Sequence, residues 1–287
     1  MKRWLILALL LASAAGALWY SAHHKSESHV GPEAVLNAMA GVQREISRLP
    51  AGVVRLSDDE EARIGAEMAQ NYSGREGAGT PENAAIEKYV TDIGRNIGAR
   101  AHRKFDYKFY YIPSEGFINA FALPGGHIFI GKGLLHLMKT EDELAAVLGH
   151  EVEHVDHYHC NERVALEARL RHLPLSGLVA LPMELFQAGY SKEQELEADR
   201  DGTALSVMAG YSPQGAVHLF EAFDRLYKRV ENNPGSPDEE LSQVALGTLE
   251  GYFRSHPLAR ERIDQIQGLI VSQKWPQPEE KILKLKF

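Results

Sequence analysis

Cysteine is nearly absent from this chain of 287 residues: Cys160 stands alone, which excludes an intramolecular disulfide and a zinc site built from several cysteines. Basic residues are outnumbered, because 31 Lys and Arg stand against 39 Asp and Glu and give a net charge of −8. A general phosphate-backbone binder needs a basic face, so no nucleic acid partner is expected. The sequence also lacks repeats, and its 44% hydrophobic content excludes a mostly disordered protein.

The N-terminus carries a long apolar run. Lys2 and Arg3 precede a stretch of apolar and small residues from Trp4 to Tyr20, and positions 12–14 have the Ala-Ser-Ala form that signal peptidase reads. As a helix, this stretch would extend about 25 Å, the low edge of a bilayer roughly 30 Å thick. Residues 1–20 therefore predict either a signal peptide or a membrane anchor. In both cases we expect an exported protein, in the periplasm or at the outer face of the inner membrane.

The rest of the chain divides into three segments. We expect residues 21–55 to form a linker and an amphipathic helix, 56–273 to form the main domain, and 274–287 to form a C-terminal tail. The predicted apolar stripe of that first helix consists of Val35, Met39, Val42, Ile46 and Leu49.

Helix-start signals dominate the main domain. Spacings typical of a capping box or of proline at a helix start occur at Ser57 and Glu60, Thr80 and Pro81, Thr140 and Glu143, and Ser191 and Gln194. The box at position 140 predicts a helix that runs toward Cys160. Three short apolar segments, 106–113, 117–123 and 127–130, predict a small antiparallel sheet beside that helix. The expected fold class is α+β and mostly α-helical.

The predicted helix from position 140 contains the sequence HEVEH, an HExxH motif at 150–154. At about 100° per residue, His150 and His154 lie on one helix face, so both imidazoles can reach one zinc ion. Glu151 lies beside them, where a carboxylate can take a proton from a metal-bound water that attacks a carbonyl carbon. The pattern predicts metal-assisted hydrolysis.

A zinc hydrolase needs a third protein ligand, and the predicted helix after Ser191 offers two candidates. Glu195 and Asp199 are four residues apart, on one face. One can bind zinc while the other accepts a hydrogen bond from a ligand histidine. The remaining acids of this helix, Glu193, Glu197 and Asp201, are then expected to be solvated.

These motifs resemble those of a known family. HExxH followed by Glu-x-x-x-Asp at 195–199, the stretch NAFALPGG at 119–126, and His256-Pro257 with Arg262-Ile263 resemble the HtpX-like, BepA-like and CAAX-prenyl-endopeptidase family of gluzincin zinc metallopeptidases. The resemblance covers roughly residues 56–270. It implies a gluzincin metallopeptidase domain at 56–273 that binds one Zn²⁺ per chain.

The resemblance also implies roles for individual residues. His150, His154 and Glu195 would bind zinc, Glu151 would be the general base, and Asp199 would orient a ligand. Two positions depart from the family pattern: Glu153 stands where a small residue is usual, and Tyr158 where an arginine is usual. We expect Glu153 to crowd the packing behind the zinc or to act on His150 through its charge.

Two further residues belong to the predicted active site. By the same resemblance, His256 lies on a loop near the metal, where it either occupies the open coordination position of a latent enzyme or binds the transition state; the alternative is a helix-start histidine without a zinc contact. Arg262 either orients substrate and stabilises an oxyanion, or forms an ion pair with an acid such as Asp199.

Asn119 and Ala120 are the candidates for substrate binding. In the family that the chain resembles, this strand edge pairs with extended substrate, and Asn119 would contact the substrate backbone. Its alternative role is that of a turn residue. The apolar stretch 173–188, too short and broken to cross a bilayer, is interpreted as a lid over the cleft or a membrane-touching segment. A second metal site at His157, His159 and Cys160 is not favoured.

The function predicted from these residues is that of a zinc-dependent endopeptidase, with metal-bound water as nucleophile and Glu151 as general base. By resemblance, its substrates are unfolded or misassembled envelope proteins, bound in extended form. The alternative is a zinc-binding periplasmic chaperone or assembly factor of the same fold that holds such clients without cutting them. If residues 1–20 are kept as an anchor rather than cleaved as a signal peptide, they would associate the protein with the membrane.

Overall fold

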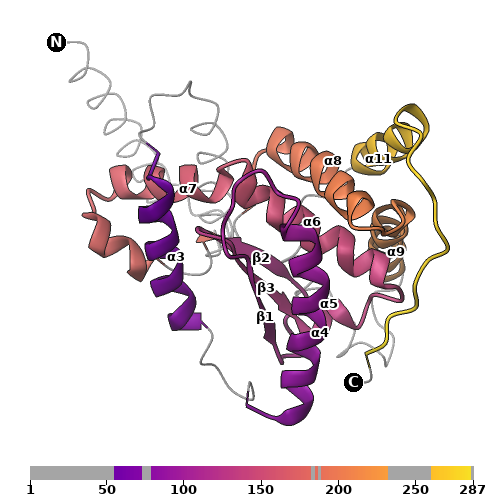
Figure 1. The fold of residues 1–287 in the computed structure, drawn as a ribbon, viewed down its shortest axis with the longest axis horizontal. Helices are drawn as coiled ribbons and strands as arrows, with labels where there is room; N and C mark the ends of the chain where they lie inside the picture. Colours follow the sequence, from indigo (N-terminus) through magenta and orange to yellow (C-terminus); the bar gives the residue numbers. More distant parts are fainter. Residues whose placement is uncertain (1–54, 73–78, 182–184, 187–188, 232–259, 286–287) are drawn as a thin grey trace, which may run out of the picture. The chain divides into compact units, whose positions relative to one another are not determined.

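The computed structural model describes residues 55–72, 79–181, 185–186, 189–231 and 260–285. The segment predicted as signal or anchor at 1–20, the predicted helix within 21–55 and the candidate His256 lie outside the described residues. In chain order the elements are α3 (Asp58–Tyr72), α4 (Pro81–Gly98), β1 (Lys108–Ile112), β2 (Ala120–Leu123), β3 (His127–Gly131), α5 (Lys132–Leu135), α6 (Glu141–Asp156), α7 (His159–Leu170), the 3-10 helix η1 (Leu175–Ala180), α8 (Lys192–Met208), α9 (Gln214–Glu231) and α11 (Arg260–Ser272) (Figure 1).

The helix starts follow the capping signals. Thr140 accepts a hydrogen bond from the backbone N–H of Glu143, and the Glu143 side chain reaches back to the cap, which completes a capping box. Ser191 and Gln194 do the same for α8. These bonds satisfy backbone N–H groups that have no partner within the first helical turn, so local sequence fixes where both helices begin.

The sheet has three strands in the order β1-β3-β2. β2 pairs antiparallel with β3, whereas β1 pairs parallel with β3, so the sheet is mixed rather than antiparallel throughout as predicted. The physical reason is that β2 does not pair with β1. After β2 the chain turns back at Gly125 and Gly126, both at positive φ, and β3 then lies between β1 and β2. With its many helices and one small sheet, the domain confirms the α+β, mostly helical class.

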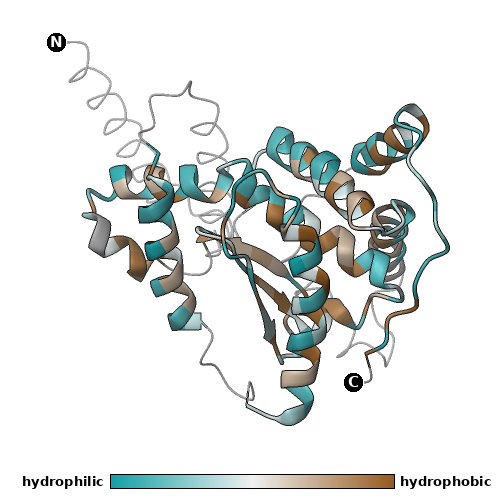
Figure 2. Ribbon diagram, in the orientation of Figure 1, coloured by the Kyte–Doolittle hydropathy of each residue, from teal (hydrophilic) through white to brown (hydrophobic). Residues whose placement is uncertain are grey.

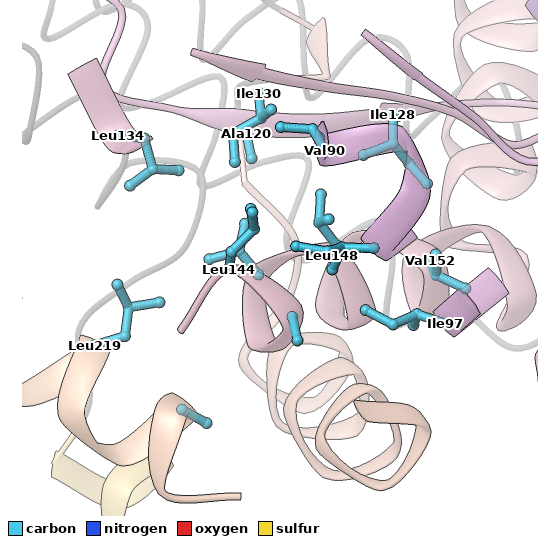
Figure 3. Close-up of a cluster of buried hydrophobic side chains, with 14 of the residues drawn as sticks. Val90, Ile97, Ala120, Ile128, Ile130, Leu134, Leu144, Leu148, Val152 and Leu219 are labelled. Atoms are coloured by element: carbon cyan, nitrogen blue, oxygen red, sulfur yellow. The ribbon is translucent and has the colours of Figure 1, made fainter. Parts of the chain in front are cut away.

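Helices cover both faces of the sheet. Alternate strand residues such as Ile128 and Ile130 pack with α4 and α6, where Val90, Leu144 and Leu148 meet them (Figure 3). The opposite face, including Phe121 and Phe129, packs with side chains of α3, α7 and η1. Figure 2 shows the strands as a mostly apolar layer among helices that carry hydrophilic residues. Within the described residues, no helix is both long enough and apolar enough to span a membrane.

Helix α6 is the central element, and nearly all of its side chains are buried. It ends at Asp156 rather than running on toward Cys160, because Tyr158 adopts a left-handed backbone conformation (φ 64°) before α7 begins. Asp156 accepts hydrogen bonds from the backbone N–H groups of His102 (2.8 Å) and Arg103 (2.6 Å). The loop after α4 thus ties down the end of α6.

Two glycines set the approach of α6 to α8. A Cβ atom on Gly202 would lie 2.6 Å from the backbone N of His150 and 2.6 Å from the carbonyl carbon of Gly149. One on Gly149 would lie 2.4 Å from the Gly202 carbonyl oxygen. No side chain fits at this crossing, so the two backbones touch immediately beside the HExxH motif.

Gly202→Ala is expected to push α6 and α8 apart and to destabilise the domain by about 1–3 kcal/mol, the usual cost of overpacking. The measurement is denaturant-induced unfolding. Gly268→Ala on α11 is the control, because a Cβ there meets no atom within 4 Å and alanine favours a helix by up to about 1 kcal/mol. Equal stability of the two variants would contradict the close-contact argument.

Candidate metal centre and active site

Three buried side chains from α6 and α8 converge beside this crossing. His150 Nε2 lies 3.0 Å from His154 Nε2, and the Glu195 carboxylate oxygens lie 3.4 Å from His150 Nε2 and 3.6 Å from His154 Nε2. All three residues are at most 6% exposed. The structure therefore brings together the three residues predicted to hold zinc, and they form a group that could hold a metal ion.

The spacing of this cluster suits zinc. Zinc bonds to histidine nitrogen and carboxylate oxygen are about 2.0–2.2 Å long, so two ligands of a tetrahedral ion lie about 3.3–3.6 Å apart. The measured separations of 3.0, 3.4 and 3.6 Å are close to that range. Two imidazole nitrogens and a carboxylate are also the ligand types that catalytic zinc sites use.

Asp199 supports one side of the cluster. Its Oδ1 lies 2.8 Å from His150 Nδ1, the ring nitrogen that does not face Glu195. Arg262 of α11 donates from Nε to Asp199 Oδ2 at 2.5 Å and from Nη2 to Oδ1 at 2.6 Å. Of the two roles considered for Arg262, the ion pair with Asp199 is therefore present, and the arginine is 2% exposed.

The charge of Arg262 keeps Asp199 ionised. Burial alone would raise the pKa of Asp199, but the guanidinium and the hydrogen bonds from Arg262 and His150 outweigh it and hold that pKa below its ordinary value. An ionised Asp199 accepts a hydrogen bond from the Nδ1–H group of His150, which leaves Nε2 of that ring as the electron-pair donor toward the cluster.

Glu151 lies directly after His150 in α6 and is 1% exposed. A carboxylate at this depth is shielded from bulk water, so its interactions with a nearby proton are strengthened. It belongs to the same helix as His150 and His154, and its role as general base stays a prediction.

His154 has a second set of neighbours. Its Nδ1 lies 2.9 Å from Nδ1 of His159, and its ring stacks on Tyr190 with centroids 3.9 Å apart. His159 Nε2 in turn lies 3.4 Å from Glu197 Oε2. Glu197, predicted to be a solvated charge, is 39% exposed at its side chain but also pairs with a buried histidine, because the α6–α7 break carries His159 back toward α8.

Glu153 belongs to a separate cluster. Its Oε2 lies 3.1 Å from His157 Nε2, and Asp201 Oδ2 lies 2.8 Å from the same nitrogen. These three residues could also hold a metal ion by spacing alone, but Arg200 already pairs with both oxygens of Asp201 at 2.6–2.7 Å. Hydrogen bonds that His157 donates to Asp201 and Glu153 raise its pKa to about 10, so an imidazolium balances the remaining charge. Asp201 is thus paired rather than simply solvated.

Asn119 and Ala120 lie at the start of β2, an edge strand of the sheet. The Asn119 side-chain oxygen accepts from the backbone N–H of Ala120 at 2.9 Å, and its carbonyl accepts from Gly131 N–H at 3.0 Å. Both residues are buried. These two hydrogen bonds fit the alternative role of Asn119 as a turn residue before the strand. The position of β2 at the edge of the sheet is the one that the substrate-binding interpretation requires.

The described part of the stretch 173–188 packs into the domain. The Tyr72 hydroxyl of α3 donates to the carbonyl of Leu181 at 2.9 Å, and Arg163 of α7 donates to the carbonyl of Leu185 at 2.9 Å. Leu178, Leu185 and Phe186 are buried against α3 and α7. These residues contribute to the core on one side of the sheet.

Together, a helix-borne HExxH motif and a buried glutamate from a second helix define a metallopeptidase-type site. The profile of Peptidase family M48 matches residues 81–270. The chain belongs to peptidase family M48, which confirms the predicted resemblance to gluzincin metallopeptidases and the enzyme class, a metalloprotease hydrolase.

The chain is also similar in sequence to individual metalloproteases. The mitochondrial metalloendopeptidase OMA1 of Schizosaccharomyces pombe is 30% identical over 52% of this chain and 42% of its own length. The beta-barrel assembly-enhancing protease of Yersinia pestis is 26% identical over 71% of this chain and 46% of its own. The metalloprotease LoiP of Escherichia coli is 28% identical over 65% of this chain and 71% of its own. The matches thus span less than half of the first two relatives.

The charge of His157 predicts a pH dependence of stability. Because its pKa is raised from 6.5 to about 10 in the folded state, its paired imidazolium contributes fully below pH 6.5 and the contribution is lost as pH rises through 10. The difference in unfolding free energy between the parent chain and His157→Gln should therefore shrink from pH 6 to pH 10.

Denaturant titrations at pH 6, 8 and 10 measure that difference. His218→Gln, at a half-exposed histidine on α9 that pairs with Glu280, is the control for a surface histidine. A difference for His157→Gln that stays constant over this pH range would contradict the assignment of a raised pKa.

Proposed function

We propose that this chain is a zinc-dependent endopeptidase with one Zn²⁺ held by His150, His154 and Glu195. The single observation that carries the proposal is the convergence of these three buried ligands, at 3.0–3.6 Å from one another, beside Glu151 of the HExxH motif. Zinc bound there would supply Lewis acidity, lowering the pKa of water and polarising the scissile carbonyl.

Other residues of the chain would transfer the proton, orient the metal ligands and bind the substrate. Glu151 accepts the proton of the attacking water and delivers it to the leaving amine nitrogen. Asp199 holds His150 in the tautomer that presents Nε2, and Arg262 keeps Asp199 ionised and fixed in place. Asn119 and Ala120 offer the edge of β2 to an extended substrate backbone.

The substrate class follows from that edge and from the likeness to named relatives. A strand edge binds any chain that is extended, so unfolded or misassembled proteins are the proposed substrates. The predicted signal or anchor at residues 1–20 supports a location in the periplasm or at the outer face of the inner membrane, and with it substrates of the cell envelope. The name of the Yersinia pestis relative, a beta-barrel assembly-enhancing protease, supports proteins in β-barrel assembly as substrates.

Glu151→Gln is expected to reduce cleavage of an unfolded protein about 100-fold to 10,000-fold, the usual contribution of a general base, while zinc binding is retained. Gel analysis of casein digestion by the purified chain, beside metal analysis, measures both. Glu162→Gln, at a glutamate of α7 that pairs with Arg55, is the matched control and should cut like the parent. If the zinc-loaded parent binds casein without cutting it, and a His256→Ala variant does not cut it either, the holding-factor alternative is correct instead.

Zinc should also stabilise the fold. At free zinc about 100 times its Kd, linkage adds about 2.7 kcal/mol to the free energy of unfolding, so the melting temperature should fall after chelation and recover on re-addition. His154→Asn should remove this response, and His218→Asn should retain it. A response that survives in His154→Asn would place the metal elsewhere.

A further inference from the structure

The two histidines of the metal cluster are supported from behind in different ways. His150 Nδ1 meets a carboxylate directly, at 2.8 Å from Asp199. His154 Nδ1 meets another imidazole, at 2.9 Å from His159 Nδ1, and the carboxylate of Glu197 lies behind that second ring, 3.4 Å from His159 Nε2. One more imidazole ring therefore separates His154 from its carboxylate than separates His150 from its own.

The proton positions along this second path follow from the geometry. A His154 that presents Nε2 to a metal carries its proton on Nδ1, which then donates to His159 Nδ1. His159 must accept at that atom, so its own proton lies on Nε2, which faces Glu197. An imidazolium at His159 would set two N–H groups against each other at 2.9 Å.

Packing holds both rings in this arrangement. His159 is 3% exposed and His154 is completely buried. Tyr190 stacks on His154 with an interplanar angle of 18°, its hydroxyl lies 3.3 Å from Cys160 Sγ, and the Arg163 guanidinium lies 3.9 Å from its ring centroid. Neither ring can rotate without breaking these contacts.

We infer that His159 and Glu197 are positioning residues that hold His154 in the tautomer and orientation needed to bind the metal. The inference rests on the proposed function, since it assumes that His154 is a zinc ligand. In this arrangement His150 contacts a carboxylate directly, whereas His154 contacts the carboxylate of Glu197 through His159. The role explains why a buried histidine and a half-exposed glutamate lie behind the cluster.

An isosteric pair of variants tests the role of His159. Asparagine places an amide oxygen close to the position of Nδ1 and keeps an acceptor for His154, whereas leucine has the same shape and no acceptor. We expect His159→Leu to weaken zinc binding about 10-fold to 100-fold, and His159→Asn to stay within about 3-fold of the parent chain. Competition with a chromophoric chelator gives the zinc Kd of the purified chain.

Glu197→Gln tests the far end of the path, with Glu193→Gln, an exposed glutamate on the same helix, as its matched control. We expect weaker zinc binding in the first variant only. The visible absorption bands of the Co²⁺-substituted chain give a second readout: they should shift in His159→Leu and in Glu197→Gln and stay unchanged in Glu193→Gln. A purely structural role in folding would not shift them in a variant that unfolds at the parent's temperature.

Several results would overturn the inference. Parent-like zinc affinity in His159→Leu, or equal losses in the leucine and asparagine variants, would show that the acceptor does not matter. Should the leucine variant fail to fold, Glu197→Gln decides: zinc affinity and Co²⁺ bands equal to those of Glu193→Gln would overturn the path. A parent chain that binds no zinc would instead overturn the proposed function, and the inference with it.

Discussion

The backbone contact of α6 with α8 at Gly149 and Gly202 is the constraint on which the metal cluster depends. A single Cβ at either position would overlap the facing backbone by a large fraction of an atomic diameter, so the helices can approach this closely only with glycine at both. The contact continues along the pair, where the Ser206 hydroxyl donates to the Ala145 carbonyl at 2.8 Å. Because His150 follows one glycine directly and Glu195 lies two turns from the other, this one distance sets the spacing of their ligand atoms.

The acids of α8 show how one helix can pair with four histidines around such a crossing. Positions 195 and 199 share one face of the helix, whereas 197 and 201 lie roughly on the opposite side. The first pair faces the HExxH histidines. The second pair reaches His159 and His157, because the left-handed residue Tyr158 redirects the chain after α6. Buried or half-buried carboxylates therefore each meet a donor, as the cost of burying charge requires.

Short sequence patterns predict part of the fold and part of the metal cluster. The i, i+4 histidines, the capping boxes and the Glu-x-x-x-Asp spacing act within one or two helical turns, so the sequence alone predicts the helix starts and three converging ligands. Such short-range patterns do not predict contacts between segments that lie far apart in the sequence. The parallel pairing of β1 with β3 depends on which strand inserts between the other two, and the neighbours of Glu153 and Glu197 depend on a single αL residue that ends α6 early. A tyrosine gives no warning of that conformation, which costs a bulky residue free energy.

Tyr158 is also where the chain departs from the family pattern, and its surroundings give the physical reason that it is tolerated. Its ring lies 3.8 Å from the Arg103 guanidinium and 4.3 Å from that of Arg55, so two cations flank it. Arg103 in turn pairs with buried Glu61 at 2.6 Å, and Glu61 accepts from Gly125 N–H in the turn between β2 and β3 at 3.2 Å. The end of the metal-binding helix and the turn of the edge strand are thus held by one buried ion pair, which couples the position of the ligands to the position of the strand that would carry substrate.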